Sequence, residues 1–460
     1  MLEWNILRLV KGIQNVGSSA ISLISKDQYV PSAFFIDTSA CGYHDARGRD
    51  AEGPSGRAVL RDNPQEATAG RDGRLLAGGY EIVPIDVVNG FLGQYYTLRA
   101  TVARSPLETK SINFFTKTPP PVSSPQYDFI QEYGTFKKEV ALYTTVFPEM
   151  LDGRDERCIP ECCLGVENDV IVLEDMAHSG YTMTDKFMPF DYEHCATLMR
   201  TLAKFHAKSL IFEQQYKKTL HDKFTPCMQE TLWPRTDGRA RAMFDAAVKG
   251  IVSMVDLLPG LNSDHDGFKN KIKELCADHT DKLSPSAKHK NVLCHGDLWA
   301  NNILFKYDDD GKPVECCLID FQLARYNPPA HDVLCFLQFT TTRQLRKKHR
   351  NTLFRIYHDS MVAVMKEAGL SISDIFPWDE FDESIRDLHV MCMIHGVLNT
   401  PIMLLGPDAV SKYFCEKPEL LESVLYVDRT PLICGQFKEA PEYRARMIDG
   451  LLELYDYLVN

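Results

Sequence analysis

The chain has 460 residues and a mass of 52.3 kDa, more than a single hydrophobic core usually organises, so we expect more than one domain. Hydrophobic residues make up 44% and charged residues 25%, ordinary values for a folded globular chain that exclude a disordered or collagen-like protein. The net charge of −12 argues against a nucleic-acid partner or a broad surface for anionic lipid. Because no run approaches about 18 apolar residues, we expect no membrane span, and no obligate protein partner is evident.

Fourteen cysteines are scattered along the chain without a CxxC pair. The adjacent pairs Cys162-Cys163 and Cys316-Cys317 are poor disulfides and poor zinc pairs, because neighbouring residues of a strand point to opposite faces. This pattern favours reduced thiols and a cytoplasmic protein.

The first 80 residues divide into two parts. We expect residues 1–40 to form a helical extension, and their start lacks the apolar core of a signal peptide. Residues 41–80 hold 8 of the 27 glycines and 6 arginines but no lysine. That composition predicts a flexible linker, or equally an insertion that comes from a wrongly translated gene model.

Short β-rich runs follow in residues 81–176, at 95–102, 111–116 and 170–173. One helix interrupts them, with Phe136, Val140 and Tyr143 at helical spacing and Pro148 expected to close it. From 177 to 460 helical patterns dominate, with apolar stripes in 198–210 and 447–458. The order predicts an α+β fold of two lobes: a small β-rich N-lobe and a larger, mostly helical C-lobe.

A strand-rich island, 292–320, interrupts the helical lobe. Its apolar runs 292–294, 303–305 and 317–319 read as strands, with the hairpin turn at 307–311. Polar residues therefore fall in loops where strands end. Asp297 follows His295 by two positions, Asn302 follows Asp297 by five, and Asp320 lies just past the third strand.

This order, H-x-D-x-x-x-x-N followed by a strand and Asp-Phe, is the layout of a kinase catalytic loop and metal-binding turn. Phosphoryl transfer needs a carboxylate that accepts the proton of the substrate hydroxyl, which we assign to Asp297. It also needs hard oxygen ligands for Mg²⁺, which we assign to Asn302 and Asp320. The alternative is an ordinary hairpin with polar turn residues.

The same hypothesis requires a lysine on the third strand and a glutamate on the next helix. Lys117 ends the FFTK strand, and Glu139 lies 22 residues later in FKKEVALY, so the pair could hold the α and β phosphates of ATP. Lys110, Lys137 and Lys138 are rivals to Lys117, and a solvated lysine–glutamate pair is the alternative.

Other parts of the expected ATP site carry weaker signals. Gly90 and Gly93, in GFLG, are candidates for a loop that covers the phosphates, or for a plain hairpin turn. Backbone groups of Glu174 and Met176 could bind adenine, although the same segment could be a simple interlobe linker.

Two further residues are expected to have supporting roles, and a third is expected to lie in the core. His295 should hold the loop by hydrogen bonds, and Asp332 should brace it from the next helix or cap that helix. His206 lies on the apolar face of its helix beside Phe205, which indicates a core histidine.

VLCHGDLWANNILF and CLIDFQLARYNPPAHDVLCFL resemble the ecdysteroid kinase-like proteins of insects, a branch of the choline/aminoglycoside kinase-like group. GFLGQYYTLR, FFTKTPP, FKKEVALY, VLEDM and LAKFHAKS look like further segments of that pattern. The resemblance runs from about Gly90 to the C-terminus, and residues 41–80 lie outside it. Gly296 in place of arginine, Gln322 in place of glycine and the lack of an APE segment depart from ordinary protein kinases.

The resemblance implies a protein-kinase-like fold and ATP- and Mg²⁺-dependent transfer of the γ-phosphate to a hydroxyl of a small molecule. An ecdysteroid or a xenobiotic alcohol is the expected acceptor. The apolar segments VMCMIHGVL and PIMLL are candidates to line its pocket, although such segments more often belong to the core. The alternatives are a choline/ethanolamine-type kinase and a catalytically inactive nucleotide-binding scaffold.

Overall fold

The computed structural model describes residues 76–85, 92–105, 108–151, 158–233, 238–261 and 264–459. The expected helical extension 1–40 and residues 41–75 of the expected linker lie outside these ranges, as does Gly90.

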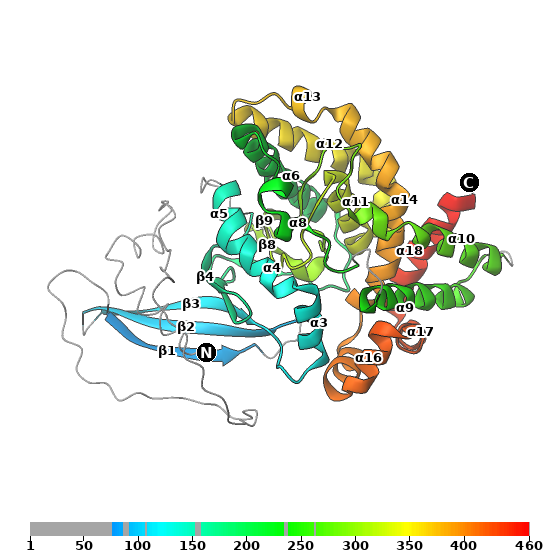
Figure 1. The fold of residues 1–460 in the computed structure, drawn as a ribbon, viewed down its shortest axis with the longest axis horizontal. Coiled ribbons are helices and arrows are strands. Elements are labelled where there is room, and N and C mark those ends of the chain that lie inside the picture. The colour runs from blue at the N-terminus through cyan, green and yellow to red at the C-terminus, as the bar shows by residue number, and fades with distance from the viewer. Residues whose placement is uncertain are drawn as a thin grey trace.

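The first part of the fold is a five-stranded antiparallel sheet in the order β1-β2-β3-β5-β4. Its strands are β1 Leu76–Pro84, β2 Gln94–Ser105, β3 Glu108–Thr118, β4 Cys162–Val166 and β5 Val170–Glu174. All three predicted strands in this region are therefore present. In Figure 1, β1 to β3 form a long ribbon that extends away from the helical part.

The expected linker boundary at residue 80 is wrong. β1 begins at Leu76 and pairs with β2 from the register Leu76↔Ala103 onward, so backbone pairing extends into the glycine-rich segment. The register shifts between Ala77 and Gly79, and the φ of 134° at Gly79 is one that residues with a side chain rarely adopt. The glycines in this segment therefore allow a strand with an irregular register, and they do not make the segment a linker.

The two faces of this sheet have different partners. Leu98, Ile112 and Val172 belong to a small apolar cluster on one face. Ile171 belongs to the main core, which also holds the helix residue Val140. Because Lys117 pairs directly with Ile171, Lys117 lies on the face that meets the helix.

The helical segment after β3 comprises α3 Pro125–Tyr133, α4 Thr135–Ala141, the π-helical η1 Leu142–Val146 and α5 Phe147–Met150. Pro148 does not close the helix as expected. It lies in the first turn of α5, after η1, where a missing backbone N–H is tolerated.

The second part of the fold contains two small sheets among helices. β6 Tyr181–Met183, β8 Ile303–Tyr307 and β9 Pro313–Leu318 form one sheet, and β7 Val292–Cys294 pairs with β10 Arg325–Asn327. The predicted turn lies between β8 and β9, where Asp308 N donates to Lys312 O at 3.0 Å. Ile319, predicted to be in the third strand, follows its end, and its N–H donates to Asn302 O.

Helices make up the rest of this part. Near the small sheets these are α6 Tyr192–Tyr216, α7 Leu220–Lys223, α8 Thr225–Met228, α9 Arg239–Met254, η2 Val255–Leu257, α10 His265–Ala277, η3 Thr280–Leu283 and η4 Ala300–Asn302. The C-terminal ones are α11 Pro329–Thr340, α12 Arg343–Glu367, α13 Ile372–Ile375, α14 Trp378–Met403, α15 Pro407–Val410, η5 Ser411–Glu416, α16 Pro418–Tyr426, α17 Thr430–Glu439 and α18 Pro441–Val459. The α+β fold with a small β-rich part and a larger helical part is confirmed (Figure 1).

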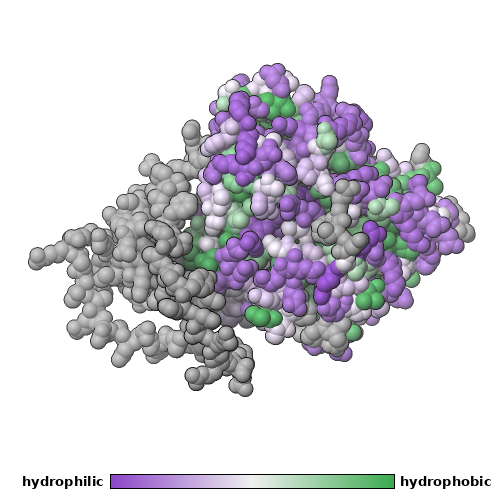
Figure 2. Space-filling model, viewed as in Figure 1, coloured by the Kyte–Doolittle hydropathy of each residue, from purple (hydrophilic) through white to green (hydrophobic). Residues whose placement is uncertain are grey.

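One core runs through most of the molecule. It joins the predicted stripes of α6 and α18 to α11, α12 and α14, and it includes the helix residues Phe136 and Phe147 of the first part. The face of the helical part seen in Figure 2 is mostly hydrophilic, with scattered hydrophobic side chains. Among the described residues, no single helix has the length and hydropathy to cross a membrane. α14 reaches that length and hydropathy only when it is combined with Pro407–Phe414, and the two helices are bent by 82° relative to each other.

Candidate active site

The loop between β7 and β8 is held from behind by Asp332, in the first turn of α11. Asp332 Oδ2 accepts from the backbone N–H of His295 at 2.6 Å, and Oδ1 accepts from that of Gly296 at 2.9 Å. His295 Nε2 in turn lies 2.9 Å from Ile319 O, at the end of β9. The predicted bracing contacts of His295 and Asp332 are thus present.

His206 anchors this brace from α6. Its Nε2 lies 3.2 Å from Asp332 Oδ2 and its Nδ1 lies 2.8 Å from the hydroxyl of Tyr357. Burial alone would raise the pKa of Asp332, but contacts with His206 and His331 outweigh it and hold that pKa below its usual range. His206 is a core histidine, as expected, and it also fixes the carboxylate that holds the loop.

Gly296 is the residue that lets the loop turn. Its φ is +80°, and a Cβ built there would lie 2.3 Å from Leu323 O. Any side chain would therefore collide with the backbone of the neighbouring loop. The departure from the arginine of protein kinases has a steric reason in this chain.

Asp297 and Asn302 face each other across this loop. Asn302 Nδ2 donates to Asp297 Oδ2 at 3.0 Å and to Asp297 O at 2.9 Å. Burial, followed by the charge of Asp320, raises the pKa of Asp297 to about 7, although hydrogen bonds from Asn302 and Trp299 oppose the shift. A carboxyl group with a pKa near 7 is suited to exchange a proton at neutral pH.

The predicted pair of Lys117 and Glu139 forms, and Asp320 joins it. Lys117 Nζ lies 2.7 Å from Glu139 Oε2 and 3.0 Å from Asp320 Oδ1. Burial would lower the pKa of Lys117, but the two carboxylates outweigh it and raise the pKa, so the amine stays protonated. The five-stranded sheet, α4 and the turn after β9 are therefore joined through the buried amine of Lys117.

Asp320 occupies a backbone conformation that few residues with side chains adopt, with φ of +66°. The next residue, Phe321, is fully buried against Phe147, and its N–H donates to Glu139 Oε1 at 3.2 Å. Burial of this ring holds the strained turn, and strain of this kind is typical of functional sites.

The rival lysines have other partners. Lys138 Nζ is buried and donates to Gln229 O and Ala324 O, both at 2.5 Å. Lys137 pairs with Glu167 at an exposed position. The side chain of Lys110 lies outside the described residues.

The residues expected to contact the nucleotide differ in how well their positions suit that role. A Cβ on Gly93 would lie 3.3 Å from Lys117 Cε, so this glycine passes directly over the lysine. Glu174 N donates to Glu161 O, and Met176 O accepts from Ser179 N, so these two backbone atoms are used within the chain. The prediction that backbone groups of Glu174 and Met176 bind adenine therefore concerns their other backbone atoms, and it stays a prediction.

The donor set fits Mg²⁺ and a nucleotide phosphate. Because Asn302 Nδ2 donates to Asp297, Oδ1 is the Asn302 atom suited to a cation, and the Asp320 carboxylate is a second hard oxygen ligand. A protonated Lys117 beside Gly93 suits an anionic phosphate.

Two supporting residues near the catalytic loop were not singled out from the sequence. Arg325 is buried, lies 3.0 Å from Glu230 and donates to Gly296 O at 3.4 Å. Trp299 is buried next to Asp297, and Lys186 Nζ lies 5.9 Å from its ring centroid. Neither role follows a sequence spacing, because the partners come from distant elements.

A cavity of about 360 Å³ lies beside the segments that hold Lys186 and Leu405. Lys186 Nζ donates to Leu405 O at 2.8 Å and lies 5.9 Å from the ring centroid of Trp299. The chain neighbours of Lys186 and of Leu405 line the cavity. Its lining comprises Asp185, Phe187, Met188, Leu404, Gly406, Gln436, Ala440, Glu442 and Tyr443. The volume is in the usual range of small-molecule sites.

The apolar segments expected to line the acceptor pocket lie mostly in the core. Met391, Ile394 and Leu398 of α14 are at most 3% exposed and pack in the main core. Only Leu404, from PIMLL, lines the 360 Å³ cavity. No described residue of VMCMIHGVL lines the 360 Å³ cavity, and only Gly396 and Val397 of this segment line the smaller hollow described next.

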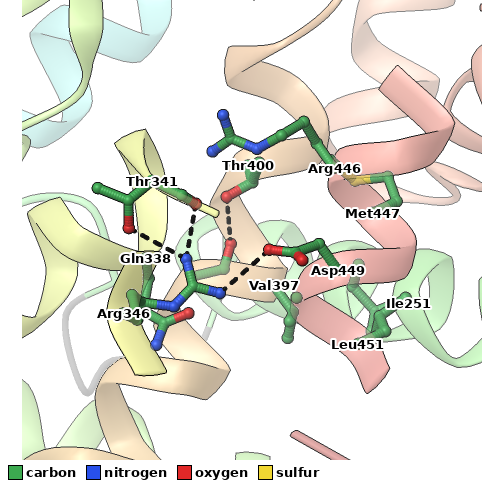
Figure 3. Close-up of a pocket in the computed structure, with 12 residues that line it drawn as sticks. Ile251, Gln338, Thr341, Arg346, Val397, Thr400, Arg446, Met447, Asp449 and Leu451 are labelled. Carbon is green, nitrogen blue, oxygen red and sulfur yellow. Dashed lines mark hydrogen bonds and ion pairs between the residues drawn. The ribbon is translucent and has the colours of Figure 1, made fainter. Parts of the chain in front are cut away.

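Another hollow, of about 20 Å³, lies among α11, α12, α14 and α18 (Figure 3). Arg346 donates to Thr341 O at 2.6 Å and pairs with Asp449 and Glu453 there. The space is about that of one water molecule, so these residues form a structural ion-pair network.

A family model described as the ecdysteroid kinase-like family matches residues 88–370. The chain belongs to the ecdysteroid kinase-like family. This match spans Lys117, Glu139, Asp297, Asn302 and Asp320, and the family assignment makes the chain a kinase-like phosphotransferase. The two lobes are accordingly those of a kinase-like fold.

Several solved structures are similar to this ecdysteroid kinase-like chain. The GDP and kanamycin complex of APH(2")-IIia is 14% identical, with a TM-score of 0.39, and the match covers 80% of this chain and 94% of that one. A microcompartment-associated aminopropanol kinase is 11% identical, with a TM-score of 0.40, covering 81% and 94%. The choline kinase LicA from Streptococcus pneumoniae is 12% identical, with a TM-score of 0.31, covering 68% and 93%. No curated protein matches the chain.

Proposed function

We propose that this ecdysteroid kinase-like protein transfers the γ-phosphate of ATP, in the presence of Mg²⁺, to a hydroxyl of an ecdysteroid or a xenobiotic alcohol. The observation that carries the proposal is that the carboxylates of Glu139 and Asp320 both pair with the amine of Lys117. Asp297 and Asn302, joined by a hydrogen bond, supply the other two functional groups that phosphoryl transfer needs.

The residue roles follow from their chemistry. The acceptor oxygen attacks the γ-phosphorus, the bond to the bridging oxygen of ADP breaks, and the hydroxyl proton passes to Asp297. Lys117 neutralises phosphate charge, and Glu139 holds the lysine in place. Asn302 and Asp320 would hold Mg²⁺, which supplies charge neutralisation at the phosphates when bound.

We assign the acceptor to the 360 Å³ cavity. Phe187, Met188 and Leu404 give it apolar walls, while Gln436 provides a hydrogen-bonding group. Among the described residues, those that line the cavity include no lysine or arginine, which favours a neutral or cationic acceptor over an anionic one. The cytoplasmic location expected from the cysteines stays a prediction.

The lining also favours a second candidate, a kinase of choline or ethanolamine type. Asp185 and Glu442 lie in the same cavity as the aromatic residues Phe187 and Tyr443. Acidic and aromatic groups together suit a quaternary ammonium ion. An inactive nucleotide-binding protein is the third alternative, which turnover would exclude.

The test is to incubate the protein with Mg-ATP and an ecdysteroid, or with choline, and to record product masses. We expect an ecdysteroid product heavier by about 80 Da, the mass of one phosphoryl group. Leu404→Arg should abolish this product while Mg-ATP still stabilises the protein. A phosphorylated choline with unmodified ecdysteroid would support the second candidate. Stabilisation by Mg-ATP without any product would support the inactive protein.

A further inference from the structure

A group of histidines and cysteines lies buried behind the catalytic loop. His331 and Cys335 are one turn apart on α11, so they share a face, and His395 approaches them from α14. One ligand atom from each of the three lies within 4.8 Å of the other two. All three residues are at most 2% exposed.

The spacing suits a shared metal ion. His331 Nε2 lies 3.8 Å from Cys335 Sγ, and the ring centroids of His331 and His395 are 5.4 Å apart. Ligand bonds of about 2.0 Å to nitrogen and about 2.3 Å to sulfur place tetrahedral ligand atoms roughly 3.3 to 3.6 Å apart. Small side-chain movements would therefore bring these atoms into a tetrahedral site.

The surrounding contacts orient both imidazoles. His279 Nε2 lies 3.1 Å from His395 Nδ1, so Nε2 is the His395 nitrogen available to a metal. His331 Nδ1 lies 3.8 Å from Asp332 Oδ1 and has no hydrogen-bond partner among the described residues, although it is buried. A histidine that binds a metal through Nε2 carries its proton on Nδ1 and commonly directs it at a carboxylate.

A neighbouring group of the same composition does not have these properties. His206, Cys294 and Asp332 also lie within 4.8 Å of one another. Both Asp332 oxygens, however, already accept backbone N–H groups of the catalytic loop, and Cys294 Sγ donates to Asn327 O at 3.3 Å. That group is satisfied by the chain itself.

We propose that His331, Cys335 and His395 bind one Zn²⁺ ion. A thiolate with two imidazoles is a ligand set typical of zinc. Cys392, also on α14, donates its thiol to His331 O at 3.9 Å and is not one of the three residues whose ligand atoms lie within 4.8 Å of one another, so its sulfur would have to move to become a fourth ligand. The ion would join α11 to α14 and lies one residue from Asp332, so its role is to fix the helix that braces the catalytic loop.

Zinc content of the untagged full-length protein, expressed in zinc-supplemented medium and desalted, tests this inference. We expect one zinc ion per chain by elemental mass spectrometry, and more than about a tenfold loss in Cys335→Ala. Cys195→Ala, which alters an equally buried cysteine of α6, and Asp320→Ala should both retain the zinc. Zinc-free wild-type protein, or zinc unchanged in Cys335→Ala, would overturn the assignment.

A spectrum of the wild-type protein keeps the test valid if Cys335→Ala does not fold. Protein expressed with Co²⁺ in place of Zn²⁺ should show a thiolate-to-cobalt charge-transfer band and the strong visible bands of tetrahedral cobalt. Cobalt bound without a thiolate band would contradict a site that contains Cys335.

Discussion

At the scale of single residues, the site depends on a few charged groups with close partners. The spacing of Asp297, Asn302 and Asp320 was readable in the sequence because a loop of fixed length places them. Lys117 and Glu139 were readable from their order on a strand and a helix. The partners of Lys138 and Arg325 could not be predicted from the sequence, because the tertiary fold alone brings Ala324 O next to Lys138 and Glu230 next to Arg325.

The pKa of Asp297 predicts a pH dependence. Burial and the charge of Asp320 raise this pKa to about 7, and only the deprotonated carboxylate can accept a proton. The rate at saturating Mg-ATP should therefore rise with pH through about 7 and level off above it. Asp297→Asn should lower this rate by at least about 10²-fold and remove the rise.

Asp309→Asn is the matched control for this measurement, because Asp309 is exposed in the β8–β9 turn. It should keep both the rate and the profile. An Asp297→Asn protein with the wild-type pH profile would show that another group accepts the proton.

At the scale of secondary-structure elements, the strands were predicted well and their limits less well. The strands were recognisable because β-branched and aromatic residues recur in short runs. The start of β1 at Leu76 was not, because pairing with β2 overrides its glycine content. The core position of VMCMIHGVL could not be read either, since an apolar segment looks the same in a core and in a pocket.

Lys138 should set the position of α4 relative to the loop after Asp320. Lys138→Met leaves the carbonyls of Gln229 and Ala324 without this donor, and the Ala324 carbonyl, whose bond is buried, costs about 1 to 3 kcal/mol when left unsatisfied. We expect a lower Tm and weaker Mg-ATP binding by calorimetry. Lys137→Met changes the exposed neighbour and should alter neither. Equal effects of the two variants would contradict the assignment.

Gly296→Ala tests the tight turn of the catalytic loop. The new Cβ would lie 2.3 Å from Leu323 O, so the loop must move and activity should be lost. Gly311→Ala is a matched control, because Gly311 also has a positive φ, +76°, but no atom within 4 Å of its Cβ position. If both variants retain activity, the loop does not depend on this close approach.

At the scale of the whole molecule, the two-part α+β architecture was predictable because strand-type and helix-type patterns occupy separate stretches of the sequence. The way in which the two parts contact each other was harder to predict from the sequence. The junction rests on the buried contacts of Lys117 with Glu139 and Asp320, and on Phe321 packed against Phe147. A ligand that contacts both parts should therefore stabilise the entire chain.

Mg-ATP should raise the Tm of the wild-type protein. At a concentration about 100 times its Kd, a ligand of the native state adds about 2.7 kcal/mol to the free energy of unfolding. The shift should disappear in Asp320→Ala, which removes a proposed metal ligand, and persist in Asp310→Ala, which alters an exposed turn residue. A full shift in Asp320→Ala would place the nucleotide elsewhere.

The central claim is that Asp297 accepts a hydroxyl proton as phosphate passes from Mg-ATP to an alcohol. The most direct measurement is mass spectrometry of an ecdysteroid after incubation with Mg-ATP and either the wild-type protein or Asp297→Asn. We predict a product heavier by about 80 Da with the wild-type protein alone, while Mg-ATP raises the Tm of both proteins. Equal amounts of product from the two proteins would contradict the claim, and so would a wild-type protein that Mg-ATP stabilises but that phosphorylates neither the ecdysteroid nor choline.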